Sequence, residues 1–184
     1  MGINIVLPFN RQKAKDLKAG DRCYISGTIY SARDKAHQRI CEILKAGKSL
    51  PFELEGQVLY YMGPSPAPLG KIVGAAGPTT SSRMDTFSEL ILKAGMTASI
   101  GKGKRSIETR RLYQKYEAVY FSGFGGAGAL AASKIVDMKL AAFEDLGPEA
   151  VYKIEVKDFP IVVINDIYGE DLYEKLKNKN ISVN

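Results

Sequence analysis

The chain has 184 residues and a formal net charge of +6 at pH 7, with 45% hydrophobic and 25% charged residues. This balance is typical of a soluble globular protein and excludes a disordered tail or a fibre. No stretch approaches the roughly 20 apolar residues of a membrane span, so we expect one cytoplasmic domain over residues 1–184 that favours anionic partners.

Hydrophobic periodicity and turn signals divide the chain into short elements. In chain order they are strands over 3–7 and 22–30, a helix over 32–46, strands over 57–62 and 71–76, a helix ending near 94, a strand over 97–100, a helix over 106–116, a strand over 118–122, a helix over 127–135, strands over 139–143, 151–156 and 161–165, and a helix over 170–178. Strands alternate with helices in the middle and dominate both ends. This order predicts an α/β fold with a mixed central sheet flanked by helices.

The most informative motif is KIVGAAGPTTSSRMD, which runs from residue 71 to residue 85. Gly-Pro redirects the backbone after a strand, and four hydroxyl residues then precede Arg83. Free N–H groups at a helix N-terminus bind anions, and an arginine adds a fork that matches a carboxylate or a phosphate. Ordinary capping would need one hydroxyl and would leave Arg83 exposed, so the motif favours an anion site at Thr79 and Arg83.

Two further junctions between a strand and a helix carry cations. Arg33 lies in SARDKAHQR, one helical turn before His37, the single histidine of the chain. Lys102 lies in GKGKRS, which lacks the spacing and the Ser or Thr of a phosphate loop. Because such junctions gather at one edge of an α/β sheet, Arg33, Arg83 and Lys102 are expected to converge on a small dianion such as a dicarboxylate. The alternatives are a structural histidine and a solvated basic turn.

A glycine cluster, SGFGGAGAL, supports an alternative hypothesis from another functional class, nucleotide binding. Gly123, Gly125 and Gly128 match the GxGxxG pattern of dinucleotide sites. Too few residues follow to complete a doubly wound sheet, so close packing is favoured and a nucleotide-binding module at 123–128 is the alternative. Without Trp or an interleaving of aromatic residues with Arg, nucleic acid is not an expected partner.

The two cysteines, Cys23 and Cys41, stand in unrelated contexts, and no CxxC is present. Two thiols are too few for a zinc site or an iron–sulfur cluster. We expect both to be buried and reduced, and no metal site in this chain. Any transition metal would take most of its ligands from another chain.

The motifs resemble those of the class I (iron–sulfur) fumarate hydratases and of the β subunit of L(+)-tartrate dehydratases. GPTTSSRMD resembles the signature GPTT-x-x-RMD, and ARDKAHQR, GKGKRS and SGFGGAGAL resemble further blocks in the same order. The resemblance extends over about residues 20–168. It implies the β-subunit or C-terminal part of such an enzyme, a swivelling β/β/α domain.

The resemblance also implies a reaction, the reversible hydration of fumarate to (S)-malate in a site shared with an α subunit. That subunit would ligate a [4Fe–4S] cluster whose open iron is a Lewis acid, in an α2β2 hetero-oligomer, and this chain would be inactive alone. By position, Arg33, Arg83 and Lys102 would hold the substrate carboxylates. Thr79 would be the acid/base partner, and His37 would lie nearby among the catalytic residues.

Two departures from the family pattern leave the substrate open. Ser81-Ser82 stand where fumarases usually have Ala-Gly, and Lys104 stands where they often have Asn. Fumarate and malate are the leading substrates, and the conversion of tartrate to oxaloacetate is the alternative within the same reaction class.

Overall fold

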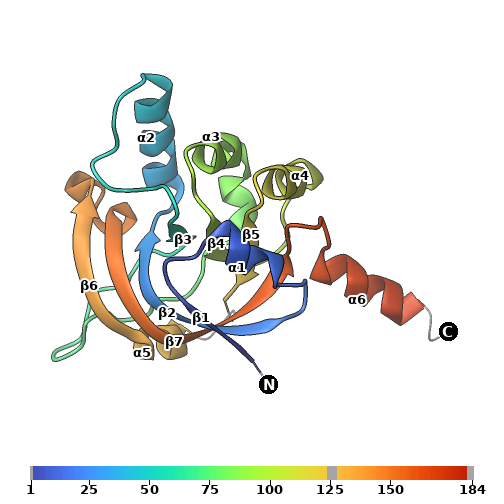
Figure 1. Cartoon of the computed structure of the whole chain (residues 1–184). Helices are drawn as coiled ribbons and strands as arrows, with labels where there is room; N and C mark the ends of the chain where they lie inside the picture. Colours follow the sequence, from blue (N-terminus) through green and yellow to red (C-terminus); the bar gives the residue numbers. More distant parts are fainter. Residues whose placement is uncertain (1, 124–127, 182–184) are drawn as a thin grey trace.

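The computed structural model describes residues 2–123 and 128–181 and has one mixed sheet flanked by helices (Figure 1). The strands are β1 (Ile3–Val6), β2 (Arg22–Ser31), β3 (Val58–Tyr60), β4 (Ala98–Gly101), β5 (Val119–Ser122), β6 (Ile135–Ala142) and β7 (Val151–Asn165). The helices are α1 (Arg11–Lys15), α2 (Asp34–Lys45), α3 (Ser88–Lys93), α4 (Ile107–Lys115), α5 (Gly128–Ser133) and α6 (Leu172–Ile181), with 3-10 helices η1 (Ser81–Phe87) and η2 (Glu144–Glu149). The predicted mixed α/β fold is confirmed.

The central strands close into a ring. β2, β3, β4 and β5 are parallel neighbours in that order. β7 runs antiparallel to β2 over most of its length and to β5 at its carboxyl end, so it joins the two outer strands of the parallel set. β1 lies beside the first part of β2, and β6 beside the first part of β7. The carboxyl ends of β2 to β5 therefore lie on the same side of the molecule.

Alternation of side chains along the strands produces two hydrophobic cores. The inner core lies within the ring and contains Ile25, Ile29, Ile100, Phe121 and Val163 among others. The outer core lies between the ring and helices α2, α3 and α4, and it contains Tyr30, Leu59, Tyr120, Ile40 and Ile91 among others. Figure 1 shows these three helices side by side over the ring. The same strands thus hold both cores together.

Helices α2 and α4 begin and end where the sequence predicts. α2 buries Ala36 and Ile40 on its apolar face, and Gly47 follows its end with a φ of +66°, a value that suits glycine. α4 begins after Ser106, whose side chain accepts a hydrogen bond from the Thr109 N–H. The bounds of both helices follow from local signals.

The predicted strand over residues 71–76 is wrong, because this segment pairs with a loop and not with the sheet. Ser65 N–H donates to Ala75 O at 3.1 Å, and Gly74 N–H donates back to Ser65 O at 3.2 Å. An added Cβ at Gly74 would lie 2.4 Å from Ser65 Oγ, so only glycine allows this approach. Backbone groups of this segment that would pair with a neighbouring strand are therefore hydrogen-bonded to the Pro-rich loop.

The last two predicted strands, 151–156 and 161–165, form the single strand β7. Asp158, with a φ of +49°, and Pro160 lie between them. On one edge, the part of β7 that pairs with β6 ends at Val156, and the part that pairs with β5 begins at Val162. Pro160 lies in the gap between them, where it removes no hydrogen bond from that edge.

Two predicted helix bounds also differ from the structure. The helix predicted to end near residue 94 is the 3-10 helix η1 followed by α3. The helix predicted over 127–135 ends at Ser133, and Ile135 already belongs to β6. No helix of the described residues is long and apolar enough to cross a bilayer.

Candidate functional site

Thr79 and Lys102 are neighbours at the carboxyl ends of β3 and β4. Thr79 N–H donates to Tyr61 O at 2.6 Å, and Lys102 N–H donates to Thr79 O at 3.2 Å. Ser81 N–H in turn donates to Lys102 O at 2.9 Å. The segment that carries Thr79 therefore continues the sheet beyond its strands. The expected helix N-terminus is that of η1, with Thr80 as its N-cap and Ser81 and Ser82 as its first residues, but it is a 3-10 helix, no side chain caps it, and Thr79 lies before the cap.

Gly101, Gly103 and Tyr120 allow the segment that carries Thr79 to lie close to the loop that carries Lys102. An added Cβ at Gly101 would lie 1.9 Å from Ser81 Oγ and 2.9 Å from Tyr61 Cδ2. The Tyr120 hydroxyl lies 2.9 Å from Ser81 Oγ and donates to Gly103 O at 2.7 Å. These contacts fix the two loops that carry Thr79 and Lys102 to each other.

Arg33 lies at the carboxyl end of β2, next to the end of β3. It is the N-cap of α2, with extended φ and ψ of −119° and −164°. Its side chain packs against Gly63, where an added Cβ would lie 2.6 Å from Arg33 Nη1. The buried Nε of Arg33 has no hydrogen-bond partner among the described residues. A buried donor without a partner costs free energy, so this guanidinium has capacity to bind a ligand.

Arg83 approaches the start of α2 through an ion pair. Arg83 Nε lies 2.9 Å from Asp34 Oδ1, and the two side chains are 52% and 25% exposed. The pair joins η1, which begins two residues after Thr79, to the residue that follows Arg33. Arg83 is thereby linked to the strand end that carries Arg33.

His37 is buried beneath these cations, with 1% of its surface exposed. Its Nδ1 lies 2.9 Å from the Arg33 carbonyl oxygen, which can only accept, so Nδ1 carries the proton. Burial, helped by the charge of Arg105 and opposed by the hydrogen bond to Arg33, lowers the pKa of His37 to about 4. Its Nε2 is therefore an unprotonated acceptor at neutral pH, and it has no partner in the described part of the chain.

A buried ion pair behind Thr79 and Lys102 was not predicted from the sequence. Arg105 Nε donates to Asp85 Oδ1 at 2.6 Å, and Ser106 N–H donates to Asp85 Oδ2 at 2.8 Å. The Arg105 side chain is fully buried, and its guanidinium also donates to Ser88 Oγ at 2.8 Å and to the Tyr113 hydroxyl at 3.1 Å. Asp85 ends one motif and Arg105 belongs to another, but neither motif indicates that the two side chains form an ion pair.

The glycine cluster contacts its own chain where the structure describes it. Ala76 N–H donates to Gly128 O at 3.1 Å, and an added Cβ at Gly128 would lie 3.4 Å from Gly77 N. Gly123 N–H donates to Gly101 O at 2.9 Å. Gly125 lies outside the described residues. The described glycines thus pack against the turn that leads to Thr79.

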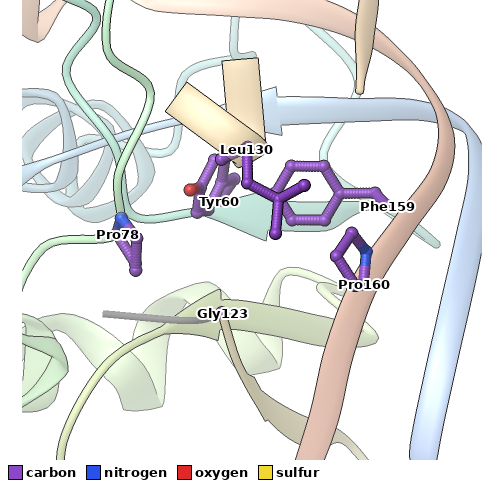
Figure 2. A pocket seen from close by; sticks show the side chains of 7 residues that line it. Tyr60, Pro78, Gly123, Leu130, Phe159 and Pro160 are labelled. Atoms are coloured by element: carbon purple, nitrogen blue, oxygen red, sulfur yellow. The ribbon is translucent and has the colours of Figure 1, made fainter. Parts of the chain in front are cut away.

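Beneath that turn is a small cavity of about 10 Å³, room for one water molecule. Figure 2 shows Tyr60, Leu130 and Phe159 along one side and Pro78 opposite. The Tyr60 and Phe159 rings pack edge to face with centroids 5.4 Å apart, and the Tyr60 hydroxyl donates to Ala76 O. The cavity is too small for an organic ligand.

The cysteines do not fit a metal centre. Cys23 and Cys41 are buried in different cores, and burial raises the pKa of both thiols, that of Cys23 to about 12. Metal ligation requires the thiolate, which both environments disfavour. No group of three His, Cys, Asp or Glu side chains that could hold a metal ion occurs among the described residues. The donor set of this chain therefore does not fit an iron–sulfur cluster.

Known proteins are similar to this chain over most of its length. The model of the family described as "Fumarase C-terminus" matches residues 2–176. The chain is 37% identical to a putative L(+)-tartrate dehydratase subunit beta of Methanocaldococcus jannaschii, over 93% of this chain and 92% of that protein. It is 38% identical to fumarate hydratase 2 of Leishmania major and 37% identical to the anaerobic class I fumarate hydratase of Escherichia coli. These matches cover 90% and 86% of this chain but only 29% of each fumarate hydratase.

Proposed function

Because this chain belongs to the fumarase C-terminal family, we propose that it is the β subunit of an iron–sulfur hydro-lyase that hydrates fumarate reversibly to (S)-malate. The dicarboxylate would bind at the carboxyl ends of β2, β3 and β4, in a site shared with an α subunit. The observation that carries this proposal is that Thr79 lies beside Lys102 while Arg83 is ion-paired next to Arg33.

Three cations suit a substrate with two carboxylates. Arg33 and Arg83 each offer a planar fork that binds a carboxylate with two hydrogen bonds, and Lys102 offers a point charge. Lys102 forms no ion pair with an acidic side chain among the described residues. Holding both carboxylates would orient the reacting carbons, and the cations would stabilise the charge that develops when the C–H proton leaves.

Thr79 is the residue that we assign to proton transfer. Its backbone is hydrogen-bonded on both sides, and its side chain is half-buried. A hydroxyl group at its ordinary pKa is a weak base and needs a neighbouring group to activate it. The adjacent Lys102 is the cation of this chain best placed to favour the deprotonated hydroxyl. His37, neutral and behind Arg33, would orient that arginine through its carbonyl.

We assign the [4Fe–4S] cluster to the α subunit, because the two thiols of this chain are buried in different cores. This chain would then be inactive alone and would act in a cytoplasmic α2β2 assembly. The carboxylate binding and proton transfer that we assign to this chain do not pass through the cluster. The residues of this chain bind, orient and exchange a proton with the substrate.

Tartrate is the second candidate substrate, favoured by the match over 92% of a putative L(+)-tartrate dehydratase subunit beta. A second hydroxyl distinguishes tartrate from malate, and a site built to bind that hydroxyl rejects the analogue without it. Assays of both substrates with the same complex decide between them. The substrate with the higher kcat/KM is the natural one.

The proposal is tested by anaerobic reconstitution of the chain with its cluster-bearing partner. We expect fumarate hydration only when both chains and the cluster are present. Arg83→Ala should lower kcat/KM by at least about 100-fold, because it leaves a carboxylate without its partner. Arg39→Ala, which removes an arginine ion-paired with Asp145 on the same helix layer, is the control and should have no effect. Full activity without partner or iron, or a loss below tenfold in Arg83→Ala, would contradict the proposal.

A further inference from the structure

We infer that Asp34 positions Arg83 for the substrate, an inference that rests on the proposed function. Asp34 touches neither the reacting atoms nor the carboxylates; it acts through the arginine. Its carboxylate contacts one edge of the Arg83 guanidinium and leaves the other edge for a ligand. This role assigns a function to an acidic residue in an otherwise cationic site.

The edge that Asp34 contacts is the one that carries Nε. Asp34 Oδ1 lies 2.9 Å from Arg83 Nε. A guanidinium has five N–H donors in a fixed plane, and its two Nη atoms form a separate edge that can bind a carboxylate with two parallel bonds. Among the described residues, Asp34 is the acidic side chain that forms an ion pair with Arg83, and the contact lies at Nε. The Nη edge is therefore available to a substrate carboxylate while Nε faces Asp34.

Asp34 is well placed to hold a mobile side chain. It is the first residue of α2, directly after the N-cap Arg33, so its backbone is fixed by the helix. Arg83 lies in a short 3-10 helix, and its side chain is 52% exposed. An exposed arginine loses much rotamer freedom when it binds a ligand. A contact that restricts Arg83 beforehand lowers that cost.

Folding does not account for this ion pair. An ion pair in which one side chain is half-exposed contributes little to stability, and Asp34 Oδ2 is buried without a hydrogen-bond partner among the described residues. By contrast, Asp85 uses both oxygens to hold Arg105 and the Ser106 N–H. Asp85 has the contacts of a structural carboxylate, whereas the ion pair of Asp34 is with Arg83.

A double-mutant cycle tests whether Asp34 acts through Arg83. The cycle uses the assembled complex and succinate, an inert dicarboxylate, with its Kd measured by calorimetry and kcat/KM measured for fumarate. Asp34→Ala should weaken succinate binding about tenfold when Arg83 is present and less than twofold in the Arg83→Ala background. Asp145→Ala, which breaks the ion pair between Asp145 of η2 and Arg39 of α2, is the matched control and should leave the Kd unchanged.

Any other outcome of this experiment contradicts either the proposed function or the positioning role of Asp34. If the wild-type complex binds no dicarboxylate, the proposed function is wrong and the role of Asp34 falls with it. If the wild type binds succinate and Asp34→Ala binds it equally well, the proposed function stands and the positioning role is wrong. An equal loss in both backgrounds, or a loss that follows a lower melting temperature of the complex, would mean that Asp34 acts on α2 and not on Arg83.

Discussion

At the scale of single residues, Gly101 shows how tightly the candidate site is built. An added Cβ would lie 1.9 Å from Ser81 Oγ, and hydrogen bonds on both sides fix the backbone of that segment. We therefore predict that Gly101→Ala lowers the free energy of unfolding by about 1–3 kcal/mol, the usual cost of overpacking. Urea unfolding followed by circular dichroism measures this change.

Two further variants show whether the Ser81 hydroxyl causes that loss. Gly101→Ala combined with Ser81→Ala removes the closest atom and should recover part of the stability. Gly123→Ala is the control, because an added Cβ there would lie 3.4 Å from Pro78 Cγ, an ordinary contact. If Gly123→Ala were as harmful as Gly101→Ala, the close approach to Ser81 would not be the cause.

Because His37 is buried, we predict that the free energy of unfolding depends on pH. Burial lowers the pKa of His37 from 6.5 to about 4, so between these values the unfolded chain binds a proton that the folded chain does not. The free energy of unfolding should therefore fall as the pH is lowered through this window, by about 3 kcal/mol at most from this residue. His37→Asn removes the titration, and its urea midpoint should fall less between pH 7 and pH 4.5. Parallel pH profiles of the two proteins would contradict the buried neutral imidazole.

The sequence indicated the cations of the candidate site, but it did not indicate the residues that hold those cations in place. Lys102 follows a predicted strand that the structure contains, whereas Arg83 follows the predicted strand over 71–76, which is wrong, so the place of Arg83 near α2 depends on its ion pair with Asp34. Asp34 and Arg105 gave no such signal, because an ion pair across many residues depends on tertiary packing. The role of Thr79 in catalysis remains a prediction.

At the scale of elements, one buried ion pair joins η1 to the start of α4. Asp85 lies in η1, and Arg105 lies just before α4 with its side chain fully buried. Removal of one partner leaves the other charge buried without compensation, which typically costs about 3–5 kcal/mol. We predict a loss of this size for Asp85→Ala, measured by urea unfolding of the chain.

The double variant Asp85→Ala with Arg105→Met separates the pair from its surroundings. It should be less destabilised than the sum of its single variants, because no unpaired charge remains. Asp145→Ala, which breaks an exposed ion pair, is the control and should leave the urea midpoint unchanged. Additive losses would mean that each side chain acts through its other contacts.

Local signals predicted the elements better than their partners. The bounds of α2 follow from its apolar face and its terminal glycine, which are properties of neighbouring residues. The false strand over 71–76 and the single strand β7 depend on which segment takes the hydrogen bonds, and this is decided by packing. The closure of the ring through β2 and β7 joins the two ends of the chain, so no local pattern contains it.

At the scale of the whole molecule, the inner and outer cores share the same strands. Residues that alternate along β2, such as Ile29 and Tyr30, face different cores. Loss of either core therefore exposes one face of the strands that bound the other. This arrangement favours a single cooperative unfolding transition.

The two cysteines make this cooperativity measurable, because Cys23 lies in the inner core and Cys41 in the outer core. Both are buried, with 1% and 4% of their surfaces exposed, and should not react with a thiol reagent in the native state. In variants that keep one cysteine each, Cys41→Ala and Cys23→Ala, we predict that labelling begins at the urea concentration at which the circular dichroism of the same variant is lost. Labelling of Cys41 well below that concentration would mean that helices α2, α3 and α4 leave the ring while its strands remain paired, and the two cores would then be independent units.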